Sequence, residues 1–309
     1  MDPRLVWDMW RRILTDDRLV EWVVNPGGRG DLPVELSPDE RAILDDYART
    51  PVATDTNIGM YRRGLVRNAL AALSFVPLTR HLLCMTDLDI EEVAEDFTRS
   101  TGYRDFGPHF WEAAGAFVAY LADQPDFAAP AQQDVFQLDL ATVELARRLG
   151  AAVATGDNQD LSAPSTAPVR AGHGRVRASR AVMVVATGHA LSDWIENPDS
   201  FDPEEALALG PGYTLVYFPA DGGRHGYVQL SEAAAAIFTQ LAQPCTVAEV
   251  SRRLDGMAES RIAAVIDSLR PLGVIVDVPH PLEAVAGSGG AGGVASRVHP
   301  ARKVAHVSR

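Results

Sequence analysis

The sequence predicts an α+β protein, in which an N-terminal all-α helical bundle precedes a C-terminal winged-helix-like domain with a small antiparallel sheet and three helices. Apolar residues recur with helical spacing through residues 1–150. Residues 213–276 instead read as two short strands, three amphipathic helices and a return strand. The predicted divisions are a helical domain (1–152), a linker (153–175), a winged-helix-like domain (176–282) and a basic tail expected to be disordered (283–309).

Local signals mark each C-terminal element. Tyr213–Phe218 and Tyr227–Leu230 are rich in aromatic and β-branched residues. The glycines of Asp221-Gly-Gly-Arg224 supply the positive φ that a tight hairpin turn needs. Ser231 opens the first helix, and Thr246-Val-Ala-Glu249 is a capping box for the second. The remaining elements are a first strand at Arg180–Val185, a third helix with Ile262, Val265, Ile266 and Leu269 on one face, and a return strand at Val274–Val276.

Helices in the N-terminal half follow from apolar spacing and start signals. Ser37-Pro-Asp-Glu40 combines a capping box with proline at the first helical position. We expect apolar segments at 5–14 and 19–24, and helices at 57–73, 77–86, 89–101, 108–122 and 131–149. Residues 193–209, between the first strand and the hairpin, predict two short helical turns.

A winged-helix unit can place its third helix in DNA, or it can add an extended peptide to a sheet edge. DNA binding requires cations against phosphate. The third predicted helix offers Arg261 and Arg270 but also Glu259 and Asp267, and the formal net charge of the chain is −13. We therefore rank peptide capture above DNA binding. A DNA-binding regulator with a helical sensor domain, and a unit that only packs against its neighbour, remain alternatives.

A peptide strand would pair with the last hairpin strand, next to the third helix. Main-chain hydrogen bonds tolerate sequence variation, so side-chain pockets would set specificity, although some of these positions must belong to the core. The candidate peptide-binding residues are Tyr227, Val228, Gln229, Leu230, Ile262, Ile266 and Arg270.

The segments Gly226–Ser231, Glu232–Ile237 and Thr246–Val250 resemble the pyrroloquinoline-quinone leader-peptide chaperone and related recognition elements. That family has strands, then a turn into the first helix, then a Thr-Val-x-Glu start to the second. The resemblance implies that the domain grips the leader of a ribosomally made precursor peptide.

A second resemblance covers residues 37–149. Its motifs are Tyr61-Arg62-x5-Asn68, Gly107-x9-Phe117-x3-Leu121, Asp134 and Glu144. This order resembles the helical domain of partner subunits that accompany multinuclear non-haem iron oxidative enzymes in methanobactin and 3-thiaglutamate biosynthesis. Those partners also carry a C-terminal leader-binding module.

Together the resemblances imply a non-catalytic accessory subunit, not an enzyme. It would form a heterodimer with an iron-dependent oxidative enzyme and present a ribosomal precursor peptide to it. Iron is expected in that enzyme, and no cofactor is expected in this chain. Candidate partner-interface or structural residues are Tyr61, Arg62, Asn68, Asp134 and Glu144. We expect Arg62 to pair with Asp134 or Glu144.

The residues themselves indicate no catalytic or metal site. The histidines form no His-x3-His pair, and His109, His173 and His189 are interpreted as surface or capping residues. Cys84 and Cys245 lie in different predicted domains, so a disulfide is not expected. An enzyme with an unrecognised site is a third hypothesis, without a cluster of titratable residues to support it.

The surface and the location are predicted from composition. The acidic cluster Glu91-Glu92 and Glu95-Asp96 is interpreted as a solvated helix face, with a partner-facing patch as the alternative. No run approaches the roughly 18 apolar residues of a membrane span. The N-terminus has no apolar stretch like a secretory signal. A cytoplasmic protein that contacts no membrane is therefore expected.

Overall fold

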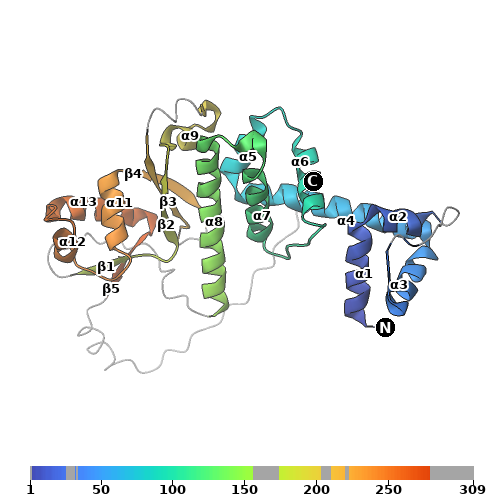
Figure 1. The fold of residues 1–309 in the computed structure, drawn as a ribbon. Helices are drawn as coiled ribbons and strands as arrows, with labels where there is room; N and C mark the ends of the chain where they lie inside the picture. The colour runs from blue at the N-terminus through green and yellow to red at the C-terminus, as the bar shows by residue number, and fades with distance from the viewer. Residues whose placement is uncertain are drawn as a thin grey trace, which may run out of the picture.

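The computed structural model describes residues 2–25, 32, 34–155, 174–202, 210–219 and 223–278. It contains a helical N-terminal half, followed by small antiparallel sheets and a second group of helices (Figure 1). The α+β class is therefore confirmed. The predicted 153–175 linker lies mostly outside the described residues, and the predicted tail lies entirely outside them.

Most of the N-terminal helices begin at a proline or at a capping side chain, and α7 is the exception. At the start of α3 the Ser37 hydroxyl accepts from the Glu40 N–H, and the Glu40 carboxylate accepts from the Ser37 N–H, which confirms the predicted capping box. The helices are α1 (Pro3–Thr15), α2 (Asp17–Val24), α3 (Pro38–Ala48), α4 (Pro51–Ala72), α5 (Pro77–Cys84), α6 (Ile90–Ser100), α7 (Phe110–Ala122) and α8 (Pro130–Ala154), with 3-10 turns at η1 (Leu73–Phe75) and η2 (Pro125–Phe127).

The long helix α4 joins two separate helical cores. Its first half packs with α1, α2 and α3 around Leu14, Leu44 and Ile58. Its second half, which includes Val66 and Ala69, belongs to the core formed by α5–α8. Figure 1 shows α4 running from the first group to the second. The helix begins at Pro51, six positions before the predicted 57–73 range, because a proline suits its first turn.

The second half contains β1 (Arg175–Ala178), β2 (Val182–Thr187), α9 (Ser192–Glu196), η3 (Pro198–Ser200), β3 (Gly212–Tyr217), β4 (Gly226–Leu230), α11 (Glu232–Gln240), α12 (Val247–Arg253), α13 (Glu259–Leu269), η4 (Arg270–Leu272) and β5 (Ile275–Val278). The predicted hairpin is confirmed as β3 and β4, whose pairing runs from Tyr213 opposite Leu230 to Tyr217 opposite Gly226. Part of its predicted turn, Asp221 and Gly222, lies outside the described residues. The short elements α9 and η3 fall in the predicted 193–209 segment.

The return strand does not extend the hairpin sheet. Strands β2, β3 and β4 form one antiparallel sheet in that order, whereas β5 pairs with β1 in a separate two-stranded sheet. The register places Val176 opposite Asp277 and Ala178 opposite Ile275. The sequence prediction had no β1, because Arg175–Ala178 is short and falls at the predicted linker boundary.

The three-stranded sheet is covered on both faces. Alternate side chains, such as Val185 and Val216, point toward α8 and enter the helical core. Their neighbours, such as Val184 and Leu215, point the other way and pack with α11, α12 and α13. In Figure 1 α8 stands between this sheet and the other N-terminal helices. The second half of α4, helices α5–α8 and one face of the sheet therefore share one continuous core.

The two cysteines do not form a disulfide bond with each other. Cys84 is exposed, Cys245 is buried, and both are free thiols. None of the described helices is both long and apolar enough to cross a membrane.

Candidate functional site

Among the strands that the structure describes, β4 is one border of the three-stranded sheet, as the predicted peptide site requires. The Phe218 N–H donates to the Ala181 carbonyl. The backbone N–H and carbonyl groups of the odd-numbered residues of β2 are therefore directed toward β3. Because ladder hydrogen bonds alternate along antiparallel strands, Gly226, Val228 and Leu230 then pair with β3. The backbone groups of Tyr227 and Gln229 consequently face away from β3, where an added strand could pair with them.

The side chains of β4 differ in their exposure to solvent. The Gln229 side chain is exposed, whereas Val228 and Leu230 pack toward the C-terminal core. Tyr227 points the other way, and its hydroxyl donates to Asp139 of α8 at 2.8 Å and lies 3.2 Å from the Thr142 hydroxyl. The Tyr227 side chain therefore ties the sheet to α8, and only the backbone of this candidate residue remains at the edge of the sheet.

The other predicted peptide contacts are also interior residues. Ile262 and Ile266 are completely buried in the C-terminal core, so they cannot line an open groove in this conformation. Arg270 is 4% exposed and makes two 2.7 Å hydrogen bonds to Asp277 of β5. Some of the candidate positions were expected to belong to the core, and the structure places Ile262 and Ile266 there. Core and binding positions have the same apolar spacing on a helix, so the sequence did not distinguish them. The Arg270 pair holds the end of α13 against the two-stranded sheet.

The opposite border of the sheet, β2, faces a groove of about 680 Å³. Its floor includes Val182 and Val184, and its walls come from Leu149 of α8 and Phe238 of α11. By the same alternation, the backbone groups of Val182, Val184 and Ala186 face away from β3. One of them, the Ala186 carbonyl, accepts from the Gln137 side chain at 3.4 Å. Both border strands, β2 and β4, therefore have outward backbone groups with which a peptide could pair.

Behind β4 lies a buried carboxyl group that the sequence analysis missed. Asp139 is fully buried and accepts hydrogen bonds from the Tyr227 hydroxyl and, at 2.6 Å, from the Thr79 N–H at the start of α5. Burial raises the pKa of Asp139 to about 6, although these hydrogen bonds oppose the shift. Asp139 therefore connects α8, α5 and β4 through one carboxylate. The one signal in the sequence was its position on the apolar face of α8, beside Val135 and Leu138.

His225 lies beside this cluster, at the start of β4. Its ring contacts those of Phe75, Phe218 and Tyr227 at centroid distances of 5.4–5.7 Å. Burial, with a smaller contribution from Arg224, lowers the pKa of His225 to about 4. The imidazole is consequently neutral at neutral pH and acts as an aromatic packing residue.

The second predicted group of residues does not form a single cluster. Arg62 pairs with Asp17 at 2.9 Å and donates to the Leu14 carbonyl, so the predicted pairing with Asp134 or Glu144 is wrong. The reason is that α4 places Arg62 against α1 and α2, away from α8. The guanidinium group also lies 4.6 Å from the centre of the Tyr103 ring.

The two acidic residues of this motif have different partners, and neither of them contacts Arg62. Asp134 bonds to the Nδ1 atom of His189 at 2.5 Å and so fastens α8 to the loop after β2. The interpretation of His189 as a surface or capping residue is therefore wrong, since it is buried. Glu144 is an exposed residue that pairs with Arg147 and Arg148 on its own helix. His109 is exposed as predicted, and His173 lies outside the described residues.

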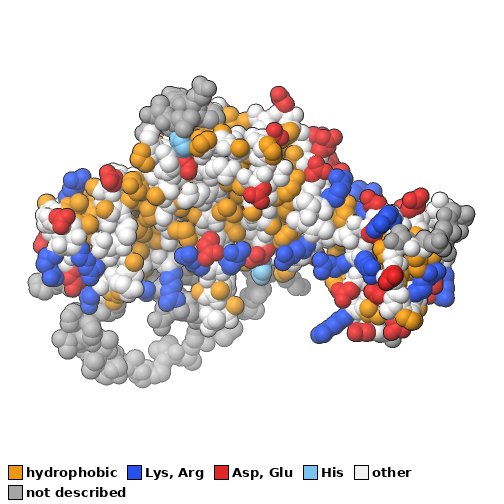
Figure 2. Space-filling view, viewed as in Figure 1, with side chains coloured by type: hydrophobic (Ala, Val, Ile, Leu, Met, Phe, Trp, Pro, Cys, Tyr) orange, Lys and Arg blue, Asp and Glu red, His pale blue; other side chains and the backbone are white. Residues whose placement is uncertain are grey.

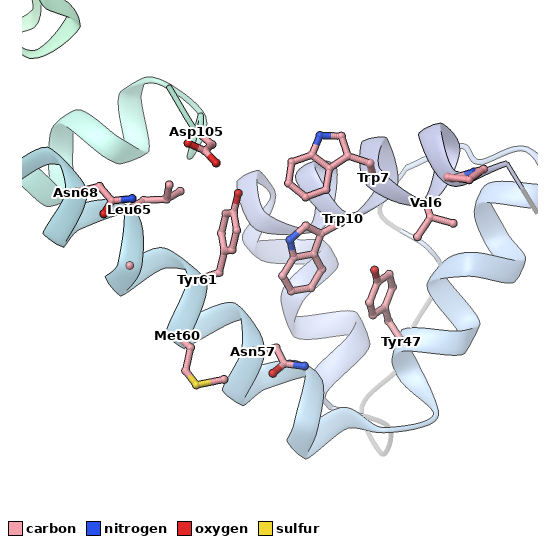
Figure 3. A pocket seen from close by; sticks show the side chains of 12 residues that line it. Val6, Trp7, Trp10, Tyr47, Asn57, Met60, Tyr61, Leu65, Asn68 and Asp105 are labelled. Carbon is pink, nitrogen blue, oxygen red and sulfur yellow. The ribbon is translucent and has the colours of Figure 1, made fainter. Parts of the chain in front are cut away.

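Tyr61 and Asn68 do line a common cavity, an open pocket of about 750 Å³ between α1, α3, α4 and the loop before α7. Figure 3 shows aromatic side chains from α1, α3 and α4 around it, with Asp105 at one side. The pocket is lined by Pro3, Val6, Trp7, Trp10, Tyr47, Asn57, Met60, Tyr61, Gly64, Leu65, Asn68 and Asp105. No sequence motif indicated Trp7 or Trp10, because their partners come from distant helices.

The exposed surface of α13 does not favour DNA. Its exposed residues are Glu259, Ser260, Arg261, Ala264 and Ser268, so a single arginine faces solvent. Figure 2 shows basic and acidic side chains interspersed over the end of the molecule where α12 and α13 lie. Such a surface lacks the basic stripe on which phosphate binding depends. On α6 the residues Glu91, Glu92, Glu95 and Asp96 are exposed, as predicted.

The described residues contain no group of three or more His, Cys, Asp or Glu side chains arranged to hold a metal ion. No protein-family model and no curated protein matches the chain.

Proposed function

We propose that this chain is a non-catalytic partner subunit that binds a ribosomal precursor peptide and presents it to a multinuclear iron-dependent oxidative enzyme. The observation that carries the peptide-binding part is the sheet β2-β3-β4, with both faces covered and backbone groups of β4 directed outward. A peptide can reach such a sheet only at its borders, where main-chain pairing gives affinity. The choice of partner rests on the Tyr61-Arg62-x5-Asn68 motif and the motifs that follow it.

Within this proposal the leader peptide adds to β4, next to Gln229. The covered faces support an edge mechanism because they hold the strand in place without loss of its outward hydrogen-bonding groups. Tyr227 contributes its backbone, while its side chain fixes β4 to α8 through Asp139 and Thr142. Specificity then comes from exposed neighbours such as Gln229, since Ile262 and Ile266 are buried.

Gln229→Pro is expected to weaken leader-peptide binding about tenfold or more. Proline removes the outward N–H of Gln229 and adds a ring at the edge, but it leaves the bonds from β4 to β3 intact. Loss of one main-chain hydrogen bond together with a steric clash readily exceeds the 1.4 kcal/mol that corresponds to a tenfold change. Fluorescence anisotropy with the labelled precursor encoded beside this gene measures the dissociation constant.

Ala186→Pro is the matched control, because Ala186 is exposed and its N–H faces outward on the other border. It should leave peptide affinity unchanged. If Ala186→Pro weakens peptide binding and Gln229→Pro does not, the peptide binds along β2 instead of β4. If neither variant changes the affinity, the sheet-edge mechanism is wrong. The partner assignment is tested separately: co-purification with the neighbouring oxidative enzyme should give a one-to-one complex in which only that enzyme carries iron.

A further inference from the structure

The aromatic walls of the N-terminal pocket meet at nearly right angles. The Tyr61 ring is inclined by 77° to Trp7 and by 81° to Trp10, with centroid distances of 6.5 and 6.1 Å. Tyr47 lies on the far side of Trp10, at 5.4 Å. A flat ligand such as a nucleobase would require two parallel walls. Rings that form a corner instead present several π faces to one small volume, which suits a compact group.

The charge of the pocket has one sign as far as the described residues show. Among those that line it only Asp105 is charged, and none is a lysine or an arginine. One Asp105 oxygen accepts from the Gly107 N–H at 2.9 Å, and the part of the chain that the structure describes contains no ion pair to this carboxylate. Burial raises the pKa of Tyr61, and Asp105 adds to that shift more than Arg11 opposes it. The acidic group therefore acts on the same space that the rings enclose.

The position of Asp105 is fixed by neighbours outside the pocket. Tyr103 adopts a positive φ of 52°, and its N–H bonds to the Thr98 carbonyl at 2.8 Å. The Arg62 guanidinium group lies over the Tyr103 ring. The adjacent residues Tyr61 and Arg62 thus have complementary positions: one forms a wall of the pocket, and the other holds the loop that carries its carboxylate.

We propose that this pocket binds a cationic side chain, arginine or lysine, of a partner polypeptide. Electron-rich ring faces and a carboxylate attract a cation together, and neither repels the alkyl stem that carries it. Trp7 is 47% exposed and Met60 is 54% exposed, so apolar surface at the rim remains open for the rest of the partner segment. This inference goes beyond leader binding at β4 and does not depend on it.

The test follows the indole N–H signals of the full chain by NMR during titration with N-acetyl-arginine amide. Neutral N-acetyl-citrulline amide has almost the same shape and is the matched control probe. The indole signals of Trp7 and Trp10, assigned with Trp7→Phe and Trp10→Phe, should shift and saturate. Those of Trp22, Trp111 and Trp194 should not move. The dissociation constant should be about tenfold lower for arginine than for citrulline.

Asp105→Asn is expected to remove most of the preference for arginine over citrulline. Asparagine can keep the hydrogen bond to the Gly107 N–H, so the loop should keep its position. Asp126→Asn, a neutralisation of an exposed carboxylate away from the pocket, should change nothing. Equal affinity for the two probes, or equal shifts of all five indole signals, would overturn the proposal. Peptide affinity at β4 is measured independently, so the two proposals can fail separately.

Discussion

Phe117→Ala is expected to lower the free energy of unfolding by about 3–5 kcal/mol. Phe117 is fully buried in α7, and its ring stacks on Phe97 of α6 with the centroids 4.6 Å apart. The close contact between α7 and α8 leaves little room for collapse around the cavity, because even a Cβ on Gly115 would lie 2.8 Å from Val143 of α8. Urea denaturation followed by far-ultraviolet circular dichroism measures the change.

Phe110→Ala provides the matched control for this variant. Phe110 is the first residue of the same helix and is 57% exposed, so the same substitution should cost less than about 0.5 kcal/mol. Because the core around Phe117 continues to Val216 of the sheet, the Phe117→Ala protein should still unfold in one transition. A first transition confined to the helical half, or equal effects of the two variants, would contradict the shared core.

Local signals predicted the elements that depend on neighbouring residues. The capping boxes at Ser37 and Thr246 act within four residues, and the structure confirms both. The hairpin strands followed from composition, because β-branched and aromatic residues fit a pleated surface. Helix lengths were less accurate: α8 continues past Gly150 to Ala154, since a single glycine costs only about 1 kcal/mol relative to alanine and need not end a long helix.

Contacts between distant residues were not predictable in this way. The partner of Tyr227 is Asp139, 88 positions earlier, and the partner of Arg62 is Asp17. An alternating strand pattern shows that a sheet has two faces, but it does not show that both are covered. The strand pattern therefore did not show that the Tyr227 side chain points into the molecule. For the same reason, Ile262 and Ile266 could not be assigned to core or groove from their spacing alone.

The buried pair behind β4 gives the second large prediction, a pH dependence of stability with two opposing parts. Asp139 has a pKa of about 6 in the folded state and a reference value of 3.8. Between these values the folded state binds the proton and the unfolded state does not, so stability falls as pH rises from about 4 to 6. His225 has a pKa of about 4 against 6.5, so the unfolded state binds more protons in that window. Its contribution to stability falls as pH falls.

Each shift of slightly more than two pH units corresponds to roughly 3 kcal/mol, and the value for half-buried His225 is an upper bound. Because the slopes have opposite signs and overlapping windows, the unsubstituted protein should show a shallow profile between about pH 4 and 6.5. The exposed carboxylates with lowered pKa values, such as Glu40 and Glu249, are common to all variants. Differences between variants therefore isolate the buried groups.

Asp139→Asn is expected to expose the contribution of His225, so that stability rises with pH across this window. Asparagine can still accept from the Thr79 N–H and can donate to the Tyr227 hydroxyl oxygen, so both partners remain bonded. His225→Phe keeps an aromatic ring against Phe75 and Phe218 and should give the opposite slope. Urea denaturation across the pH range measures both profiles, and the double variant should show only the pH dependence of the exposed carboxylates that all variants share. Parallel profiles for the two single variants would show that neither group titrates as its burial requires.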